Sequence, residues 1–510
     1  MAVEPAIRLK KLKIIKKEIT SMQSIVKSIL AMPSLNLANT VLGNDALRRL
    51  ALKVGDKKIY HTFVEKNSSG SPIRCQEDKY YMLRNMLNSI NRALENKRVS
   101  PSVRKGLIKI LVGKVLLESN ATIRAFNETH GFGAPGFLLI SPTKRCNLRC
   151  IGCYASSSSA NAEKLDYDMV DRILREKKDL WGSHFTVISG GEPLMWRSEG
   201  KDLIDIAAQH SDQYFLMYTN GTLIDEKMAQ RMAEVGNITP AISVEGLEKE
   251  TDARRGKGVH KRILKAFENL RNSGVPFGIS ITATRQNAEF VLSNEFMDFY
   301  FEQQGAVYGW IFQYMPIGRS YTLDLMVTPE QRKWMFEREQ HLIREKVLFI
   351  ADFWNSGAVA NGCISGGRPG GYFYIDWNGN CLPCAFNPYT VDNIKQVYQR
   401  GGDLNTVLMN PFFQAIRKWQ RKYSYMKPAH EVGNQIVPCI SKDHHREARM
   451  IVDTTGARPA DQEAEEALKD PSYYRGLIAY GDEADRLTSP IWEKEYIGPE
   501  RERVEKEKAA

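Results

Sequence analysis

The stretch Cys146-Asn-Leu-Arg-Cys150-Ile-Gly-Cys153-Tyr154 follows a short apolar run, Phe137–Ser141. Three thiolates on one loop can hold three irons of a cubane cluster and leave the fourth iron without a protein ligand. A catalytic metal centre needs an open coordination position, whereas a structural zinc site needs a fourth protein ligand. No fourth Cys or His lies nearby in the sequence. We therefore expect a 4Fe-4S cluster on Cys146, Cys150 and Cys153.

The region around this loop alternates between apolar runs and amphipathic stretches, which indicates an α/β fold with a parallel sheet. The five further predicted strands are Phe185–Ser189, Phe215–Thr219, Ala241–Val244, Gly278–Thr282 and Trp310–Met315. The predicted helices between them include Tyr167–Leu180, Asp225–Val235 and Arg262–Ser273. Six such units are fewer than the eight of a closed barrel, so the pattern is compatible with a partial barrel or a doubly wound sheet.

Polar motifs follow the carboxyl ends of the later strands, where barrel proteins carry their chemistry. The second strand runs into Ser189-Gly190-Gly191-Glu192-Pro193, and the third into Tyr218-Thr219-Asn220-Gly221-Thr222. The fourth ends in Ser243-Val244-Glu245-Gly246 and is followed by Arg254 and Arg255. Paired glycines let the main chain approach a ligand closely, and an acceptor-rich turn suits an ammonium group.

Together, the cysteine spacing, the aromatic after the last cysteine and these turns resemble the radical S-adenosylmethionine (SAM) superfamily over about residues 135–320. The resemblance implies a partial (β/α)6 TIM-type barrel and an oxidoreductase or transferase-type enzyme. It implies reductive cleavage of SAM to a 5′-deoxyadenosyl radical that abstracts hydrogen from a substrate, with a reductant such as flavodoxin or ferredoxin. The implied SAM-binding residues are Tyr154, Gly190, Gly191, Glu192, Pro193, Asn220, Ser243, Glu245, Arg255 and Thr282. Glu245 stands where relatives often have Asp.

The sixth strand runs into Gln313-Tyr-Met-Pro316-Ile-Gly318-Arg319, which resembles the P-x-G-R segment that closes such barrels. Its apolar residues either line a substrate cavity or belong to a packed core strand; they are Trp310, Phe312, Tyr314 and Met315.

Four late cysteines, Cys363, Cys381, Cys384 and Cys439, form a second group. Tyr374–Cys381 contains an Asn-Gly pair and predicts a β-hairpin. The spacing from Cys363 through Gly379 to Cys384 resembles a SPASM/Twitch-like module, which implies a second 4Fe-4S cluster with every iron ligated by cysteine. A zinc site is the alternative, and His444 and His445 are alternatives to Cys439 as ligands. Cys75 has no other cysteine near it in the sequence, and we expect it to be an ordinary buried thiol.

These features divide the 510 residues into four predicted regions. Residues 1–130 form a helical N-terminal region, with helices at Tyr80–Leu94 and Val103–Leu117, and residues 131–345 form the radical SAM core. Residues 346–455 form the small iron–sulfur module. Residues 456–510 form a polar extension that we expect to be a frayed helix or disordered.

Composition points to a cytoplasmic protein, because no run of about 18 apolar residues and no secretory signal is present. Eight cysteines in such a chain are expected to stay reduced. The first 30 residues form a basic amphipathic pattern that predicts a helix packed on the body, a contact with an anionic membrane surface or a helical partner. The net charge of +11 comes without a nucleic-acid-binding motif, so no nucleic-acid partner is expected.

The substrate is expected to be a lipid or isoprenoid chain, or a peptide. Relatives with SPASM/Twitch modules often modify peptides, whereas the basic N-terminus and the aromatic sixth strand favour a lipid. The alternative of another class is a non-catalytic iron–sulfur protein for electron transfer or cluster assembly. The SAM-binding turns argue against it, because an electron carrier does not need them.

Overall fold

The structure, a computed structural model, describes residues 44–67, 69–96, 98–117 and 121–509. The predicted amphipathic helix of residues 1–30 therefore lies outside the described residues. None of the helices in the described ranges is both long and apolar enough to cross a membrane.

Six parallel strands form the centre of the molecule, in the order β1-β2-β5-β6-β7-β8. Their bounds are β1 Phe137–Ile140, β2 Phe185–Ile188, β5 Tyr214–Thr219, β6 Ile238–Val244, β7 Gly278–Ala283 and β8 Gly309–Gln313. These are the six predicted strands, in sequence order across the sheet. The predicted α/β class and partial barrel are confirmed.

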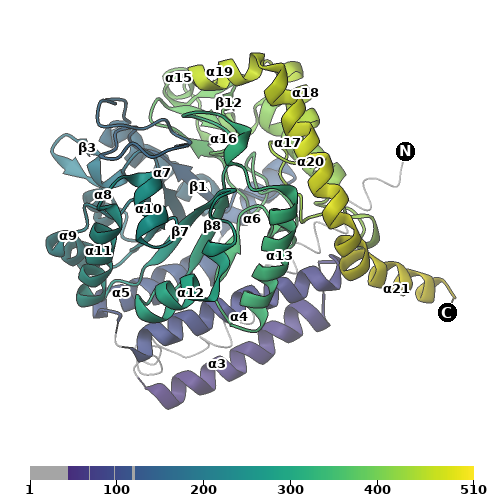
Figure 1. Cartoon of the computed structure of the whole chain (residues 1–510), viewed down its shortest axis with the longest axis horizontal. Helices are drawn as coiled ribbons and strands as arrows, with labels where there is room; N and C mark the ends of the chain where they lie inside the picture. The colour runs from purple at the N-terminus through teal and green to yellow at the C-terminus, as the bar shows by residue number, and fades with distance from the viewer. Residues whose placement is uncertain (1–43, 68, 97, 118–120, 510) are drawn as a thin grey trace.

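Helices cover the outer face of this sheet (Figure 1). They are α7 Tyr167–Trp181, α8 Leu203–Gln209, α9 Glu226–Val235, α10 Glu248–Arg255, α11 Val259–Ser273 and α12 Asn294–Met297. Alternation along each strand divides the side chains between two faces. Ile188 and Met217 pack against the helices, whereas Val187 and Leu216 face the interior. The interior face is therefore free to line a cavity.

The sheet extends beyond the six predicted strands at both ends. β9 (Ile350–Asp352) follows α13 (Pro329–Arg344) and pairs in parallel with β8. At the other end β10 (Tyr374–Ile375) pairs in parallel with β1, and its hairpin with β11 (Asn380–Leu382) continues to β13 (Asp392–Asn393). The predicted hairpin is thus present, and it belongs to the same sheet as the core. β9 has only three residues, too few for a periodic pattern.

Shorter elements complete the region after β9. The helices are α14 Gly357–Ala360, α15 Ile394–Gln399, α16 Leu404–Leu408, α17 Pro411–Tyr423 and α18 His445–Thr455. The remaining strands form two small two-stranded sheets, β3 Arg197–Ser198 with β4 Lys201–Asp202, and β12 Tyr389–Thr390 with β14 Arg458–Pro459.

The N-terminal helices lie along one side of the barrel, and the C-terminal helices lie along another (Figure 1). The N-terminal helices along this side are α3 Asp45–Tyr60, α4 Ile73–Glu95 and α5 Pro101–Gly106 with the π-helical continuation Leu107–Leu117, and the next helix, α6 Ala121–His130, packs against α7. The C-terminal helices are α19 Gln462–Lys469, α20 Pro471–Trp492 and α21 Gly498–Ala509.

The expectation of a frayed or disordered C-terminal extension is wrong for much of its length. Trp492 and Tyr496 are buried, and the Tyr496 hydroxyl donates to Asp78 of α4 at 2.8 Å. Aromatic residues among the charges give this segment an apolar stripe, which packs against α4 and α13.

Candidate active site

The three clustered cysteines line one cavity inside the barrel. Cys146, Cys150 and Cys153 lie on the loop after β1, and all three face a cavity of about 380 Å³, called here the barrel cavity. The SAM-binding candidates that line it are Tyr154, Gly190, Gly191, Asn220, Ser243, Arg255 and Thr282, and Arg254 joins them. The turns that the sequence places after separate strands thus meet at one cavity, as expected for carboxyl ends of parallel strands.

The glycine pair holds the turn after β2 directly against the cysteine loop. The Gly191 N–H donates to Thr143 O, and the Glu192 N–H donates to Arg145 O, both at 2.8 Å. A Cβ on Gly191 would lie 2.3 Å from Arg145 O, and one on Gly190 would lie 2.6 Å from Thr143 O. Gly190 also has φ +129°, which side chains rarely adopt. Two glycines are therefore required at this contact.

Glu192, one of the expected SAM-binding residues, does not line the barrel cavity. Its completely buried carboxylate accepts from Thr219 Oγ1 at 2.7 Å, Asn220 N at 2.8 Å and Leu194 N at 3.1 Å. Burial raises the pKa of Glu192, while these hydrogen bonds oppose the rise. Glu192 therefore joins the turns after β2 and β5. Pro193 is also buried behind the cavity wall.

Glu245 likewise acts behind the cavity wall. Its carboxylate, 1% exposed, accepts from Arg254 and from Arg255, with Arg255 Nε at 2.8 Å. The two guanidinium groups are thereby oriented along the cavity, and Arg255 Nη1 lies 4.0 Å from Cys150 Sγ. Two cations beside the cysteine loop suit an anionic group such as a carboxylate or a thiolate-bound cluster.

The cysteine loop is also fixed by a residue whose role was missed from sequence, Arg319. Its backbone N–H donates to Cys153 O at 3.0 Å, and its guanidinium donates to Cys150 O at 2.6 Å and to Ser157 O. The preceding Gly318 lies so close that a Cβ would fall 2.3 Å from Tyr154 O. The Pro-Ile-Gly-Arg segment was noticed as a motif, but its contact with the loop is visible only in three dimensions.

Two further contacts order this loop. Asn220 Nδ2 donates to Asn147 Oδ1 at 2.8 Å and lies 3.7 Å from Cys146 Sγ. The Tyr154 hydroxyl lies 2.9 Å from Ser189 Oγ. Burial, followed by the nearby Glu192 charge, raises the pKa of Cys146 to about 12. Burial thus favours the neutral thiol, and a metal bound here would favour the thiolate. The three thiols and the close glycine turn fit an iron–sulfur cluster.

Much of the wall of the barrel cavity is apolar and aromatic. The residues of this part include Phe137, Leu139, Phe185, Val187, Leu216, Tyr218, Trp310, Phe312, Tyr314, Met315, Phe353, Tyr372 and Phe386. All four sixth-strand candidates, Trp310, Phe312, Tyr314 and Met315, are among them. Trp310 Nε1 is a buried donor without a partner among the described residues.

A second cavity, of about 190 Å³ and called here the cysteine cavity, is lined by Cys363, Cys384 and Cys439. It shares a wall with the barrel cavity, made of Trp310, Phe353, Ile364 and Phe386. Tyr372, which lines the barrel cavity, has its hydroxyl 3.0 Å from Cys384 Sγ. Burial raises the pKa of the Cys384 thiol to about 12. Three late cysteines are thus gathered beside the first cavity.

Cys381 is separated from this group. In β11 it lies opposite Ile375, and both side chains face the outer helices, where Ile394 packs with them. Leu382 and Cys384 face the interior instead. Successive strand residues point to opposite faces, so the expected Cys381–Cys384 ligand pair is divided by the sheet. The Cys381 Sγ lies 3.7 Å from Gly379 O.

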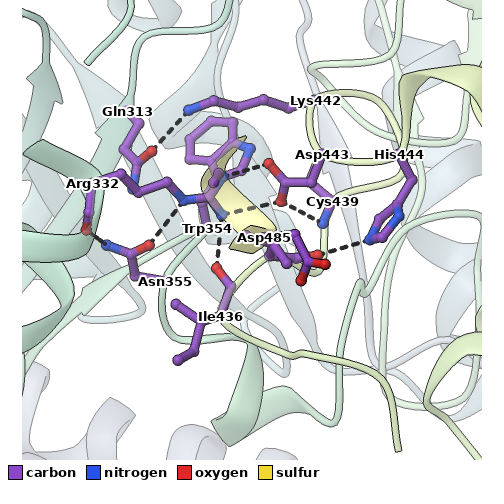
Figure 2. Close-up of polar contacts among 12 residues, drawn as sticks. Gln313, Arg332, Trp354, Asn355, Ile436, Cys439, Lys442, Asp443, His444 and Asp485 are labelled. Atoms are coloured by element: carbon purple, nitrogen blue, oxygen red, sulfur yellow. Dashed lines mark hydrogen bonds and ion pairs between the residues drawn. The ribbon is translucent and has the colours of Figure 1, made fainter. Parts of the chain in front are cut away.

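Cys439 lies on a buried turn that is tied to the body by polar contacts (Figure 2). Its N–H donates to Asp443 Oδ2 at 3.0 Å, and Asp443 forms an ion pair with Arg332 of α13. Arg332 also donates to Ile436 O at 2.8 Å and to Asn355 Oδ1 at 3.1 Å. No signal in the sequence identified Arg332.

The histidines after Cys439 are engaged elsewhere. His444 Nε2 lies 2.9 Å from Val437 O, His445 Nδ1 lies 2.9 Å from Ser441 O, and neither side chain lines the cysteine cavity. Cys75 is a buried free thiol, as expected. Among the described residues, no three Cys, His, Asp or Glu side chains converge on the position of one metal ion. In a cubane, each thiolate binds a different iron.

Part of this chain is similar in sequence to known proteins. Residues 140–289 match the family model described as the radical SAM superfamily. The Fe-coproporphyrin III synthase of Methanosarcina barkeri is 34% identical over 28% of this chain and 36% of that protein. The AdoMet-dependent heme synthase of the same organism is 26% identical over 52% of this chain and 80% of that protein.

Mycofactocin maturase MftC of Mycolicibacterium smegmatis is 29% identical over 57% of this chain and 74% of that protein. Among solved structures, Streptococcus suis SuiB bound to precursor peptide SuiA aligns with a TM-score of 0.48 and 21% identity, over 61% of this chain and 74% of that chain. The chain thus spans about a third of the first relative and about three quarters or more of the others.

Proposed function

Residues 140–289 belong to the radical SAM superfamily, and we propose that the chain is an enzyme that cleaves SAM reductively and abstracts hydrogen from a substrate. The observation that carries this proposal is the meeting of Cys146, Cys150, Cys153 and the Gly190-Gly191 turn at one cavity. Cys146, Cys150 and Cys153 would hold a 4Fe-4S cluster, which when reduced would supply the one electron that cleaves SAM to methionine and the 5′-deoxyadenosyl radical.

The residues of the chain then have separate tasks. Main-chain carbonyls at Gly190 and Gly191 would accept hydrogen bonds from the SAM ammonium, and Arg254 or Arg255 would bind its carboxylate. Ser243 and Thr282 line the cavity beside them and contact the remainder of SAM. Glu192, Glu245 and Arg319 act indirectly, because each holds a residue or loop that faces the cavity. The apolar wall excludes water from the reacting groups.

A second 4Fe-4S cluster is proposed at Cys363, Cys384 and Cys439. The support is that three thiols face one cavity next to the barrel cavity, and that three thiolates can hold a cubane with one iron free of protein ligands. Such a cluster would have one iron without a cysteine ligand. The sequence predicts four cysteine ligands, but Cys381 lies on the other face of the sheet. Zinc at the same three thiols is the alternative, which iron and sulfide analysis distinguishes.

The reacting part of the substrate is proposed to be apolar, because much of the barrel cavity wall is aromatic and aliphatic. A lipid or isoprenoid chain and an apolar segment of a peptide both fit this wall. Relatives that are named heme synthases add porphyrins to the compounds to test, and relatives named mycofactocin maturases support a peptide. Comparing lipids, peptides and porphyrins between wild-type and deletion cells identifies the class that changes.

Flavodoxin or ferredoxin is proposed as the reductant. Ile151 is 55% exposed on the loop that carries the three cysteines, which gives a small electron carrier access close to the cluster. Peripheral membrane contact through residues 1–30 also stays a proposal, based on their basic amphipathic pattern.

The test of the proposed function is anaerobic reconstitution with iron and sulfide, followed by SAM and dithionite. Formation of 5′-deoxyadenosine by the wild type, and its loss in Cys150→Ala, are the expected results. A fully loaded protein that leaves SAM intact would support the non-catalytic electron-transfer alternative.

A further inference from the structure

The Tyr372 side chain extends from the wall of the barrel cavity to a cysteine of the cysteine cavity. Tyr372 lines the barrel cavity, and its hydroxyl lies 3.0 Å from Sγ of Cys384, which lines the cysteine cavity. Tyr372 is 3% exposed. A buried tyrosine hydroxyl usually has a hydrogen-bond partner, and here that partner is the Cys384 sulfur. Tyr372 thus directly connects the barrel cavity wall with a proposed ligand of the second cluster.

The ring of Tyr372 is held in one orientation by contacts that do not involve its hydroxyl. It stacks on Phe137 of β1 with ring centroids 5.0 Å apart and an interplanar angle of 9°. Phe353 packs edge-on against it at 6.4 Å. The backbone N–H of Tyr372 donates to Ile364 O at 2.9 Å. The hydroxyl is therefore directed at Cys384 by the ring, and a phenylalanine at this position would keep the same packing.

Metal binding determines which atom of this contact donates. Between a phenol and a neutral thiol, either group can be the donor. A cysteine that binds iron is a thiolate without a proton. It can only accept, so the Tyr372 hydroxyl must then donate to Cys384. Hydrogen bonds to an ionised group are stronger than those between neutral groups. A cluster bound here would therefore strengthen this contact.

A hydrogen bond to a ligand sulfur changes the energy of reduction. When a cluster gains an electron, its sulfurs become more negative, so a donor binds the reduced form more tightly than the oxidised form. Hydrogen bonds to the sulfurs are among the determinants of cluster reduction potential. Their electrostatic effect is larger in the low-dielectric interior than in water. The Tyr372 hydroxyl therefore favours the reduced state of a cluster that Cys384 binds.

From this geometry we propose that Tyr372 is a positioning residue whose hydroxyl donates to Cys384 and raises the reduction potential of the second cluster. The inference rests on the second cluster proposed above. It assigns to a residue of the barrel cavity wall the control of how readily the neighbouring cluster accepts an electron.

The test uses the full chain with Cys146, Cys150 and Cys153 changed to alanine, so that the second cluster is the only one measured. After anaerobic reconstitution, redox titration followed by electron paramagnetic resonance gives its midpoint potential. Tyr372→Phe removes the hydroxyl and keeps the ring. The matched control is Tyr374→Phe, because Tyr374 is also 3% exposed and belongs to the same interior cluster, but its hydroxyl has no cysteine partner among the described residues.

We expect Tyr372→Phe to lower the midpoint potential, because one donor to Cys384 is lost. The Phe386 N–H, which donates to the same sulfur at 3.4 Å, remains. Tyr374→Phe is expected to leave the potential unchanged. An unchanged potential in a loaded Tyr372→Phe protein would overturn the inference, as would an equal shift in Tyr374→Phe.

A second variant tests the inference if Tyr372→Phe does not take up iron and sulfide. Replacing Tyr372 with 3-fluorotyrosine keeps the hydroxyl and makes it a stronger donor, because fluorine makes the phenol more acidic. We expect this replacement to raise the midpoint potential, and an unchanged or lower value would overturn the inference. Absence of iron and sulfide from the parent triple variant would overturn the second cluster and the inference with it. SAM cleavage by the otherwise wild-type chain is a separate readout of the proposed function.

Discussion

The guanidinium of Arg332 and the carboxylate of Asp443 form an ion pair in which both side chains are completely buried. The same carboxylate accepts a hydrogen bond from the backbone of Cys439 at 3.0 Å. The Asp443 carboxylate therefore joins α13 to the turn that carries Cys439, a proposed cluster ligand. Because both charges lie away from water, each depends on the other, and the turn depends on both.

Arg332→Met leaves the Asp443 carboxylate buried without its counterion. We expect the free energy of unfolding to fall by about 3–5 kcal/mol, as is typical when one partner of a buried pair is removed. Urea unfolding followed by tryptophan fluorescence measures this. The control is Lys333→Met on the same helix, because Lys333 is exposed and pairs with Glu337 at 3.9 Å, for which a change below about 1 kcal/mol is expected. Similar losses in the two variants would contradict the account.

Cys381→Ser tests whether the sheet separates Cys381 from the other late cysteines. We expect this variant to keep the iron and sulfide content of the wild type after reconstitution, because Cys381 faces the outer helices. Cys384→Ser, three residues away, is expected to lose about four irons per chain, the content of one cubane. Iron loss in Cys381→Ser with a retained melting temperature would show that Cys381 is a ligand.

Gly190→Ala tests the contact between the glycine turn and the cysteine loop. The added Cβ would lie 2.6 Å from Thr143 O, at a backbone angle of φ +129°. We expect SAM binding, measured by equilibrium dialysis of the reconstituted protein, to weaken at least about tenfold (a loss of about 1.4 kcal/mol). Gly200→Ala is the control, since Gly200 also has positive φ but no atom within 4 Å of a Cβ. Equal affinity of the two variants would remove the role assigned to this contact.

Much of this site follows from short-range patterns. The cysteine spacing, the Gly-Gly turn and six apolar runs separated by helical stretches each depend on neighbouring residues. Parallel strands bring their carboxyl ends together, so the meeting of these motifs at one cavity was predictable. The Asn378-Gly379 hairpin was predictable for the same reason, since it requires only a local turn.

Other features depend on residues that are distant in sequence. Glu192 and Glu245 are in the predicted motifs, but only their partners, Asn220 and Arg255, show that they act behind the cavity wall. Cys381 has a ligand-like spacing to Cys384, yet strand alternation divides them. Arg332 and Tyr372 carry no motif at all. Their roles follow from the burial of their side chains, which no local sequence pattern reports.

Asp376 in the hairpin gives the fold a pH dependence. Burial raises the pKa of Asp376 to about 6, against hydrogen bonds from Asn378 and Asn380 that lower it. The unfolded chain has the ordinary value of about 4. Between about pH 4 and pH 6 the folded protein binds a proton here that the unfolded chain does not. The free energy of unfolding therefore falls as the pH rises through this window, by up to about 3 kcal/mol.

Urea unfolding of wild type and Asp376→Asn at about pH 4 and at about pH 6.5 measures this contribution. The asparagine does not titrate, so we expect the wild type to lose stability relative to the variant as the pH rises. Parallel changes in the two proteins would show that Asp376 does not carry this proton.

The central claim is that Cys146, Cys150 and Cys153 support SAM cleavage and that the late cysteines form a separate site. Its most direct test is the amount of 5′-deoxyadenosine that reconstituted protein forms from SAM and dithionite without air. We predict formation by the wild type, none by the variant with Cys146, Cys150 and Cys153 changed to alanine, and retained formation by the variant with Cys363, Cys384 and Cys439 changed. No 5′-deoxyadenosine from a fully loaded wild type, or equal formation by the first variant, would contradict the account.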